Sequence, residues 1–273
     1  MPLGTISRDK ISNPIKQFRI LFYAGRREVG TTEPYFYDLH LHTCLSPCGD
    51  AAMTPPNIAG FAALAGLQII AVCDHNTAGN ARAVQEAARV LAPQLLVLAG
   101  IELTCAEELH MVCLFPSAEA AEAAGREVYA ALPDIKNRED IFGAQVLMDA
   151  QEQELGRIDR LLINATSVSV DDAAAFAARY GGFCYPAHID RSSQSILSTL
   201  GYLPEHLHLT TVEVAKPEVF FAESKNSGYA ERYHIITGSD AHRLEQIADA
   251  SRAIHLPECS FAALKAVLTA PKR

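Results

Sequence analysis

The amino-acid sequence predicts an α/β fold of mainly parallel strands, arranged as a sheet or a barrel. Strand-like apolar runs alternate with alanine-rich helical runs, and several of the strands are apolar on both faces, as buried parallel strands are. The 273 residues suffice for one large domain of this class. The expected strands cover residues 35–40, 67–73, 95–100, 110–115, 181–187, 210–215 and 233–238.

The helical runs begin and end at residues that commonly cap helices. Thr54 followed by Pro55 predicts a helix start, and Gly66 predicts the end of the same helix. Ser117 precedes the run AEAAEAAGREVYAA, and Ser169 precedes VDDAAAFAAR. These caps support the alternation of strands and helices independently of the apolar periodicity.

Two segments interrupt this alternation and divide the chain. Residues 1–34 are basic and irregular, and we expect an N-terminal extension there, followed by one domain over residues 35–273. Residues 133–165 are predicted to be an insertion of helical or irregular structure, near the functional site or at a subunit contact.

Composition restricts the function classes. The net charge of −9 and the pI of about 5.6 disfavour tight binding of long nucleic acids, but a small anionic substrate held by metal ions is compatible with them. Seven cysteines, an odd number scattered through apolar segments, indicate reduced thiols and a cytoplasmic location. No signal peptide and no apolar run of about 18 residues is present, so no membrane association is expected.

Histidines and carboxylates gather at the ends of the expected strands. In the stretch YDLHLHTCLSPCGD, His40 and His42 are two residues apart and therefore share one face of a strand. A single His-x-His pair is weak evidence for a metal site, but four further clusters follow other strands: CDH, GIE, PAHIDR and GSDAH. Because active sites of parallel α/β folds form at the carboxyl ends of the strands, together these clusters predict a metal centre.

The motifs YDLHLHT, AVCDHN, GIE, EELHMVCLF, PAHIDR and TGSDAH, in this order, resemble the PHP (polymerase and histidinol phosphatase) family over about residues 36–255. The resemblance implies a distorted seven-stranded (β/α)7 barrel, similar to a TIM barrel, that carries two or three divalent metal ions and hydrolyses phosphate esters. Matched position by position, it implies these metal ligands: His40, His42, Asp50, His75, Glu102, His110, His188, Asp240 and His242.

One ligand has two candidates. Members of the family carry an aspartate soon after the first motif, but here the text SPCGDAAMTP is three residues longer. Asp50 matches that aspartate if PCG is an insertion, and it is the preferred assignment. Cys48 is the alternative, because a thiolate binds zinc well.

Two further residues are expected to act in the reaction. Arg191 is predicted to hold the non-bridging oxygens of a phosphate with its planar guanidinium group. Asp74 is predicted to orient a metal-bound histidine, as such histidines usually need a carboxylate or carbonyl partner. The mixed nitrogen and oxygen ligands suit Zn, Mn or Fe.

The predicted function is a metal-dependent phosphomonoesterase that acts on a small molecule, such as histidinol phosphate or a nucleotide, through a metal-bridging hydroxide. One alternative is a nuclease that degrades short oligonucleotides from the 5' end. A second alternative is a non-catalytic, metal-stabilised binding module, although a purely structural site normally keeps no open coordination position.

Overall fold

The computed structural model describes residues 31–272, and the described residues from Thr32 onward form one compact unit. Most of the predicted N-terminal extension, residues 1–30, lies outside the described residues. The first strand, β1, begins at Glu33, close to the predicted boundary at residue 35.

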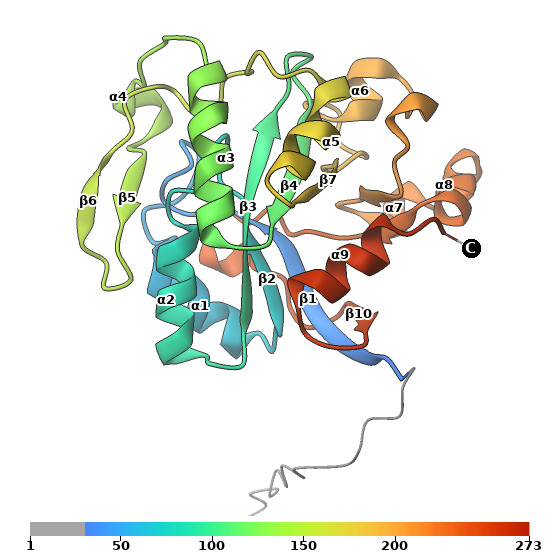
Figure 1. Ribbon diagram of the computed structural model, residues 1–273, viewed down its shortest axis with the longest axis horizontal. Helices are drawn as coiled ribbons and strands as arrows, with labels where there is room; N and C mark the ends of the chain where they lie inside the picture. The colour runs from blue at the N-terminus through green and yellow to red at the C-terminus, as the bar shows by residue number, and fades with distance from the viewer. Residues whose placement is uncertain (1–30, 273) are drawn as a thin grey trace, which may run out of the picture. The chain divides into compact units, whose positions relative to one another are not determined.

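A six-stranded sheet forms the centre of this unit (Figure 1). In spatial order its strands are β10 (Ala253–Leu256), β1 (Glu33–Leu41), β2 (Ile69–Val72), β3 (Leu96–Thr104), β4 (His110–Phe115) and β7 (Phe183–Pro186). Strands β1, β2 and β3 are parallel, whereas β4 runs antiparallel to both of its neighbours and β10 antiparallel to β1. The sheet is therefore mixed, in contrast to the mainly parallel sheet predicted from the sequence.

Two further strands extend the curve of the sheet. β8 (Thr211–Glu213) and β9 (His234–Ile236) pair with each other in parallel. The N–H of Ile189, just after β7, donates to the carbonyl of Glu213, and Leu41 of β1 forms an isolated parallel bridge with Ala241. All seven expected strands exist, but a continuous seven-stranded (β/α)7 ladder is not present among the described residues, because these two links are single contacts.

The helices start at the positions that were predicted from the capping residues. α1 (Pro55–Leu64) follows Thr54, while Ser117 and Ser169 accept backbone N–H bonds at the first turns of α3 (Ala118–Ala131) and α5 (Val170–Arg179). The remaining helices are α2 (Ala81–Leu91), α6 (Ile196–Leu200), α7 (Pro217–Phe220), α8 (Ser227–Arg232) and α9 (Phe261–Thr269).

Both faces of the sheet are buried, as predicted from the apolar strands. In β2, Ile70 and Val72 join the core that α1, α2 and α3 cover, whereas Ile69 and Ala71 join a second core that includes α9. Consecutive side chains of a strand point to opposite faces, so a strand that packs on both sides must be apolar throughout.

The predicted insertion is ordered and only partly helical. It contains a short helix, α4 (Glu139–Phe142), and an antiparallel hairpin of β5 (Val146–Met148) and β6 (Glu154–Arg157). Asn80 attaches the hairpin to the domain, because its side chain bonds the carbonyl of Val146 and the N–H of Met148.

Among the helices of residues 31–272, none combines the length and the apolar character needed to cross a membrane. All seven cysteines lie in the described part of the chain as free thiols, and the predicted reduced state remains a prediction.

Candidate metal centre

Six histidines and three carboxylates from different strands meet at one edge of the fold. They lie at the ends of β1, β2, β7, β8 and β9, within β3, and at the start of β4. The set consists of His40, His42, His75, His110, His188, His242, Glu102, Glu213 and Asp240, and all except His242 are buried. Parallel strands bring their carboxyl ends to one edge, which explains why residues far apart in the sequence converge here.

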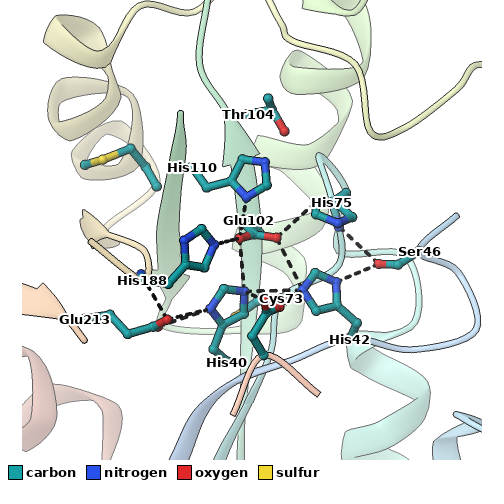
Figure 2. A network of polar contacts seen from close by, with 12 residues as sticks. His40, His42, Ser46, Cys73, His75, Glu102, Thr104, His110, His188 and Glu213 are labelled. Carbon is teal, nitrogen blue, oxygen red and sulfur yellow. Dashed lines mark hydrogen bonds and ion pairs between the residues drawn. The ribbon is translucent and has the colours of Figure 1, made fainter. Parts of the chain in front are cut away.

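Glu102 lies at the middle of this group (Figure 2). Five histidine nitrogens lie 2.8 to 3.3 Å from its two oxygens, those of His40, His42, His75, His110 and His188. Burial opposes ionisation of Glu102, but the facing charges of His110 and His40 hold its pKa well below the usual range. A carboxylate surrounded in this way has the position of a bridge between metal ions. We call Glu102 and the five histidines the Glu102 cluster.

The hydrogen bonds of His40 and His42 turn their remaining nitrogens toward each other. Nδ1 of His40 lies 3.1 Å from both carboxylate oxygens of Glu213. Nδ1 of His42 lies 2.8 Å from the hydroxyl of Ser46. With both Nδ1 atoms acting as donors, the two Nε2 atoms, 3.3 Å apart, present their lone pairs to one point.

This convergence requires a cation. Asp240 also faces it, because its Oδ1 lies 2.9 Å from Nε2 of His42. Burial opposes protonation of His42, but Asp240 and Glu102 raise its pKa to about 9. In contrast, burial lowers the pKa of His75 to about 4. The positive charge at this point is supplied by protons or, equally well, by metal ions.

Several buried atoms approach each other without forming hydrogen bonds. Nδ1 of His75 lies 2.9 Å from Oε2 of Glu102, yet neither atom has a hydrogen-bond partner within residues 31–272. Nδ1 of His110, which also has no hydrogen-bond partner, lies 2.8 Å from Oε1 of the same carboxylate. Buried polar groups are normally satisfied, so these orphaned donors and acceptors fit a site built for metal ions.

Three groups of side chains place their ligand atoms close enough together to hold an ion. They are His40, His42, Glu102 and Asp240; His75, Glu102 and His110; and His42, His75 and His242. His188 joins the centre through Nε2, which lies 3.1 Å from Oε1 of Glu102. The structure thus brings eight of the nine predicted ligands together.

Asp50 is the predicted ligand whose carboxylate is in none of these groups, although its backbone N–H donates to the carbonyl of His242. It is exposed, and its carboxylate accepts the N–H of Ala52. Sγ of Cys48, the alternative candidate, lies 3.4 Å from Nε2 of His75. Of the two candidates, Cys48 is therefore the one whose side chain contacts a histidine of the centre, in contrast to the assignment preferred from the sequence.

The carboxylate of Asp74 is linked to the centre through Ser46, which contacts His42. This carboxylate accepts from the N–H and the hydroxyl of Thr43 and from the hydroxyl of Ser46, at 2.7 to 2.8 Å. Because the Ser46 hydroxyl donates to Asp74, its oxygen acts as an acceptor toward Nδ1 of His42 and the backbone N–H of His75. Asp74 contacts neither Glu102 nor Asp240 through any of these bonds, and its place fits the predicted positioning role rather than a direct catalytic one.

Arg191 reaches the centre from the turn after β7. Its Nη1 lies 2.6 Å from Oδ2 of Asp240, while the side chain remains 45% exposed. One oxygen of Asp240 thus faces the histidines and the other faces a guanidinium group with free donors. The arrangement allows Arg191 to bind an anion that approaches the centre from solvent.

Glu213 was not predicted as a site residue from the sequence. It is fully buried and accepts from both the imidazole of His40 and the backbone N–H of His188. Gly238 makes room for it, since a Cβ there would lie 2.5 Å from Cβ of His40 and 2.9 Å from Oε2 of Glu213. The available signal was a carboxylate between Val212 and Val214 in a short buried strand, where an acid needs a partner.

Two site residues hold a backbone conformation that side chains other than glycine rarely adopt. His188 has φ of 28° and Asp240 has φ of 50°. Such left-handed residues cost free energy and persist where surrounding contacts impose them, which is typical of functional sites.

The fold and the centre together define a class of protein: a mixed α/β domain whose buried histidines and carboxylates can hold several metal ions. No protein-family model and no curated protein matches the sequence. Among solved structures, the chain is similar to the lesion-specific endonuclease PfuEndoQ from Pyrococcus furiosus, with a TM-score of 0.60 and 14% identity. This match covers 87% of the chain and 56% of the endonuclease.

Two shorter proteins are matched over most of their length. One is assigned as a metal-dependent phosphoesterase from Bifidobacterium adolescentis, with a TM-score of 0.55, 20% identity and coverage of 86% of this chain and 97% of that one. The other is an amidohydrolase from Chromobacterium violaceum, with a TM-score of 0.51, 19% identity and coverage of 82% and 93%. At these identities the similarity shows a shared fold. The chain spans little more than half the length of the endonuclease.

Proposed function

We propose that this chain is a metal-dependent hydrolase of phosphate esters. The observation that carries the proposal is the convergence of the His40 and His42 Nε2 atoms, 3.3 Å apart, on the carboxylates of Glu102 and Asp240. Metal ions bound there would polarise a phosphoryl oxygen and lower the pKa of a bound water. The resemblance to the PHP motifs and the shared fold with a metal-dependent phosphoesterase support the same reaction class.

The residues of the chain have distinct roles in this proposal. Glu102 and Asp240 hold ions together with the histidines of the Glu102 cluster and His242. Glu213 and Ser46 keep His40 and His42 in the tautomer that can bind metal. Arg191 receives the phosphate oxygens, because its guanidinium group stands over Asp240 and reaches solvent.

The proposed substrate is a small phosphomonoester. The net charge of −9 disfavours long polyanions, and Arg191 is the cation that faces the centre in the described contacts. A nuclease, predicted from the sequence to act from the 5' end, is the second candidate. The fold is shared with an endonuclease solved in complex with a 27-mer duplex that has an abasic lesion at the active site, which favours a nucleic-acid substrate but not a particular end. Short oligonucleotides need less electrostatic attraction than long ones, so charge alone does not separate the two.

The test combines metal analysis with a substrate panel. Purified protein is expected to contain two or three divalent ions per chain and to release phosphate from one of a set of esters. The set contains histidinol phosphate, nucleoside monophosphates, a bisphosphorylated nucleotide and a short 5'-phosphorylated oligonucleotide. Release of nucleotides from the oligonucleotide, without phosphate release from the monoesters, would support the nuclease. Bound metal without turnover of any ester would support the non-catalytic binding module and refute the proposal.

Two substitutions test whether hydrolysis of phosphate esters depends on the metal centre. His188→Ala and Asp240→Ala should abolish hydrolysis while the chain stays folded, because each removes a side chain that contacts the Glu102 cluster. His206→Ala is the matched control, since His206 pairs with Asp171 at the surface. Turnover at the wild-type rate in the first two variants would remove the centre from the mechanism.

A further inference from the structure

A polar pocket of about 500 Å³ lies beside the metal centre, and no step of the proposed mechanism uses it. The side chains that matter for its chemistry belong to Thr104, Glu107, Glu108, Asn164, Ser193 and Gln194. We call it the Thr104 pocket. Its volume falls within the range of small-molecule sites.

Two polar groups of the Thr104 pocket have no hydrogen-bond partner among the described residues. Thr104 is 2% exposed, and its hydroxyl is buried without a hydrogen bond. The side-chain Nδ2 of Asn164 is also buried and unpaired, although the backbone carbonyl of Asn164 accepts from Asn76. More than nine in ten buried polar groups find a partner, so two orphans in one pocket indicate a missing ligand with hydrogen-bond acceptors.

The pocket and the metal centre are joined by the chain. Thr104 follows Glu102 by two residues on β3, so both side chains point to the same face, about 7 Å apart. Figure 2 shows Thr104 beyond His110 on the side away from Glu102. An ester whose phosphate is bound at the centre could therefore extend its alcohol part toward Thr104.

The turn after β7 reaches both places. It carries Arg191, which pairs with Asp240 at the centre, and Gln194, which lines the pocket and accepts the N–H of His110. The hydroxyl of Ser195 donates to the carbonyl of Arg191 and keeps the turn compact. A phosphate held at Arg191 would therefore direct its ester group along this turn and into the pocket.

The charge of the pocket selects against a second phosphate. Glu107 and Glu108 contribute carboxylates, and none of the lining residues, all of which are described, is Lys, Arg or His. A further phosphate group would meet like charge there without a cation to compensate it. Hydroxyl and amide groups next to carboxylates instead suit an uncharged, hydroxylated ligand.

We propose that the Thr104 pocket binds the alcohol part of the substrate, and that this part is a neutral, sugar-like polyol. The inference rests on the proposed phosphoesterase function and specifies its substrate class. Thr104 and Asn164 would donate to hydroxyl oxygens of the polyol, while Glu107 and Glu108 would accept from them or repel a second phosphate. Thr104 is a specificity residue in this arrangement and takes no part in the chemistry.

The test compares two esters in two variants. Thr104→Val keeps the shape of the side chain and removes the hydroxyl, and Thr104→Ser restores the hydroxyl. Ribose 5-phosphate offers acceptors to the pocket, whereas phenyl phosphate offers none beyond its phosphate. Thr104→Val should raise KM for ribose 5-phosphate about tenfold with little change in kcat, which is the size of one lost hydrogen bond. KM for phenyl phosphate should not change, and Thr104→Ser should recover most of the loss.

Controls separate this inference from the proposed function. Thr269→Val removes a hydroxyl that bonds the Lys265 carbonyl in α9, and it should leave both esters unaffected. Equal KM values for ribose 5-phosphate in wild type and Thr104→Val, or an equal rise for both esters, would overturn the inference. If wild type hydrolysed neither these two esters nor any member of the substrate panel above, the proposed function would fail. Calorimetric binding of ribose 5-phosphate would then decide the inference by itself: tenfold weaker binding by Thr104→Val supports it, and equal or undetectable binding overturns it.

Discussion

The carboxylate of Glu213 lies 3.1 Å from Nδ1 of His40, and both side chains are fully buried. The contact joins β8 to β1 across 173 residues of sequence. Glu213 also accepts the backbone N–H of His188. Two candidate metal ligands therefore take their orientation from one carboxylate that is not itself in the Glu102 cluster.

Replacing Glu213 should weaken the metal centre without unfolding the chain. Glu213→Gln keeps the shape but weakens the acceptor for His40, so metal affinity should fall about 10- to 100-fold, as when other partners of metal-bound histidines are removed. Competition with a coloured chelator measures the affinity. Glu223→Gln, which breaks an exposed pair with Lys225, is the control. Unchanged affinity in Glu213→Gln would show that His40 needs no such partner.

Gly238 is predicted to be essential for the same contact. Gly238→Ala would place a methyl group 2.5 Å from Cβ of His40, so the two strands must separate and His40 must shift. Overpacking of this kind costs about 1 to 3 kcal/mol, and we expect a lower Tm and less bound metal. Gly228→Ala is the matched control, because no atom lies within 4 Å of the added Cβ. Equal metal content in the two variants would contradict the prediction.

Much of the centre could be predicted from the sequence because its ligands follow strand ends. His40, His75, His188 and Asp240 each stand after an apolar run, and the fold brings such positions together whatever the helices between them look like. Glu102, within β3, and His110, at the start of the antiparallel strand β4, reach the same edge, so eight of the nine predicted ligands meet there.

The remaining features depend on contacts that a strand pattern does not encode. The direction of β4 could have been predicted from its loop, because five residues between Thr104 and His110 cannot hold the crossover that parallel strands require. The left-handed backbone of Asp240 and the burial of Glu213 against His40 arise from tertiary packing. The three extra residues before Asp50 made the choice between Asp50 and Cys48 uncertain from the sequence. Only the loop geometry, which places the Cys48 thiol next to His75, favours Cys48.

Cys48 and Asp50 should differ in their effect on metal content. Sγ of Cys48 lies beside His75, whereas the carboxylate of Asp50 bonds the N–H of Ala52. Cys48→Ala should therefore lose up to one ion per chain and Asp50→Ala none, as measured by elemental analysis. In cobalt-substituted protein, a sulfur-to-metal absorption band should be present in wild type and Asp50→Ala and absent in Cys48→Ala. The opposite pattern would restore the assignment made from the sequence.

Arg191 should govern substrate binding more than metal binding. Its guanidinium group contacts Asp240 and reaches solvent, and hydrogen bonds to charged groups are worth about 1.5 to 3 kcal/mol. Arg191→Ala should lower kcat/KM for a phosphate ester about 10- to 100-fold at unchanged metal content. Arg191→Lys should recover only part of this, because an ammonium group lacks the paired donors. Arg243→Ala, an exposed arginine near His242, should stay at the wild-type rate; an equal loss there would indicate a general charge effect.

The metal-free protein should be most stable near pH 6.5. In the folded chain Asp240 and Glu102 raise the pKa of His42 to about 9, from an ordinary value of 6.5. Its contribution to the free energy of unfolding is complete below pH 6.5 and is lost as the pH rises toward 9. Burial lowers the pKa of His75 to about 4 in the folded chain. Between pH 6.5 and 4, His75 is therefore protonated in the unfolded chain but neutral in the folded chain. Stability therefore also falls as the pH decreases from 6.5 to 4.

Urea unfolding of chelator-treated protein at pH 5, 6.5 and 9 measures this dependence. The midpoint should be highest at pH 6.5. Added zinc should remove the loss between pH 6.5 and 9, because a metal-bound His42 is already deprotonated and has no proton to lose. The loss toward pH 5 should persist, since metal ions bind neutral imidazoles and protons compete for them. A midpoint that rises steadily from pH 5 to 9 without metal would show that His42 is neutral in the folded chain, and the carboxylates around it would then not hold its proton.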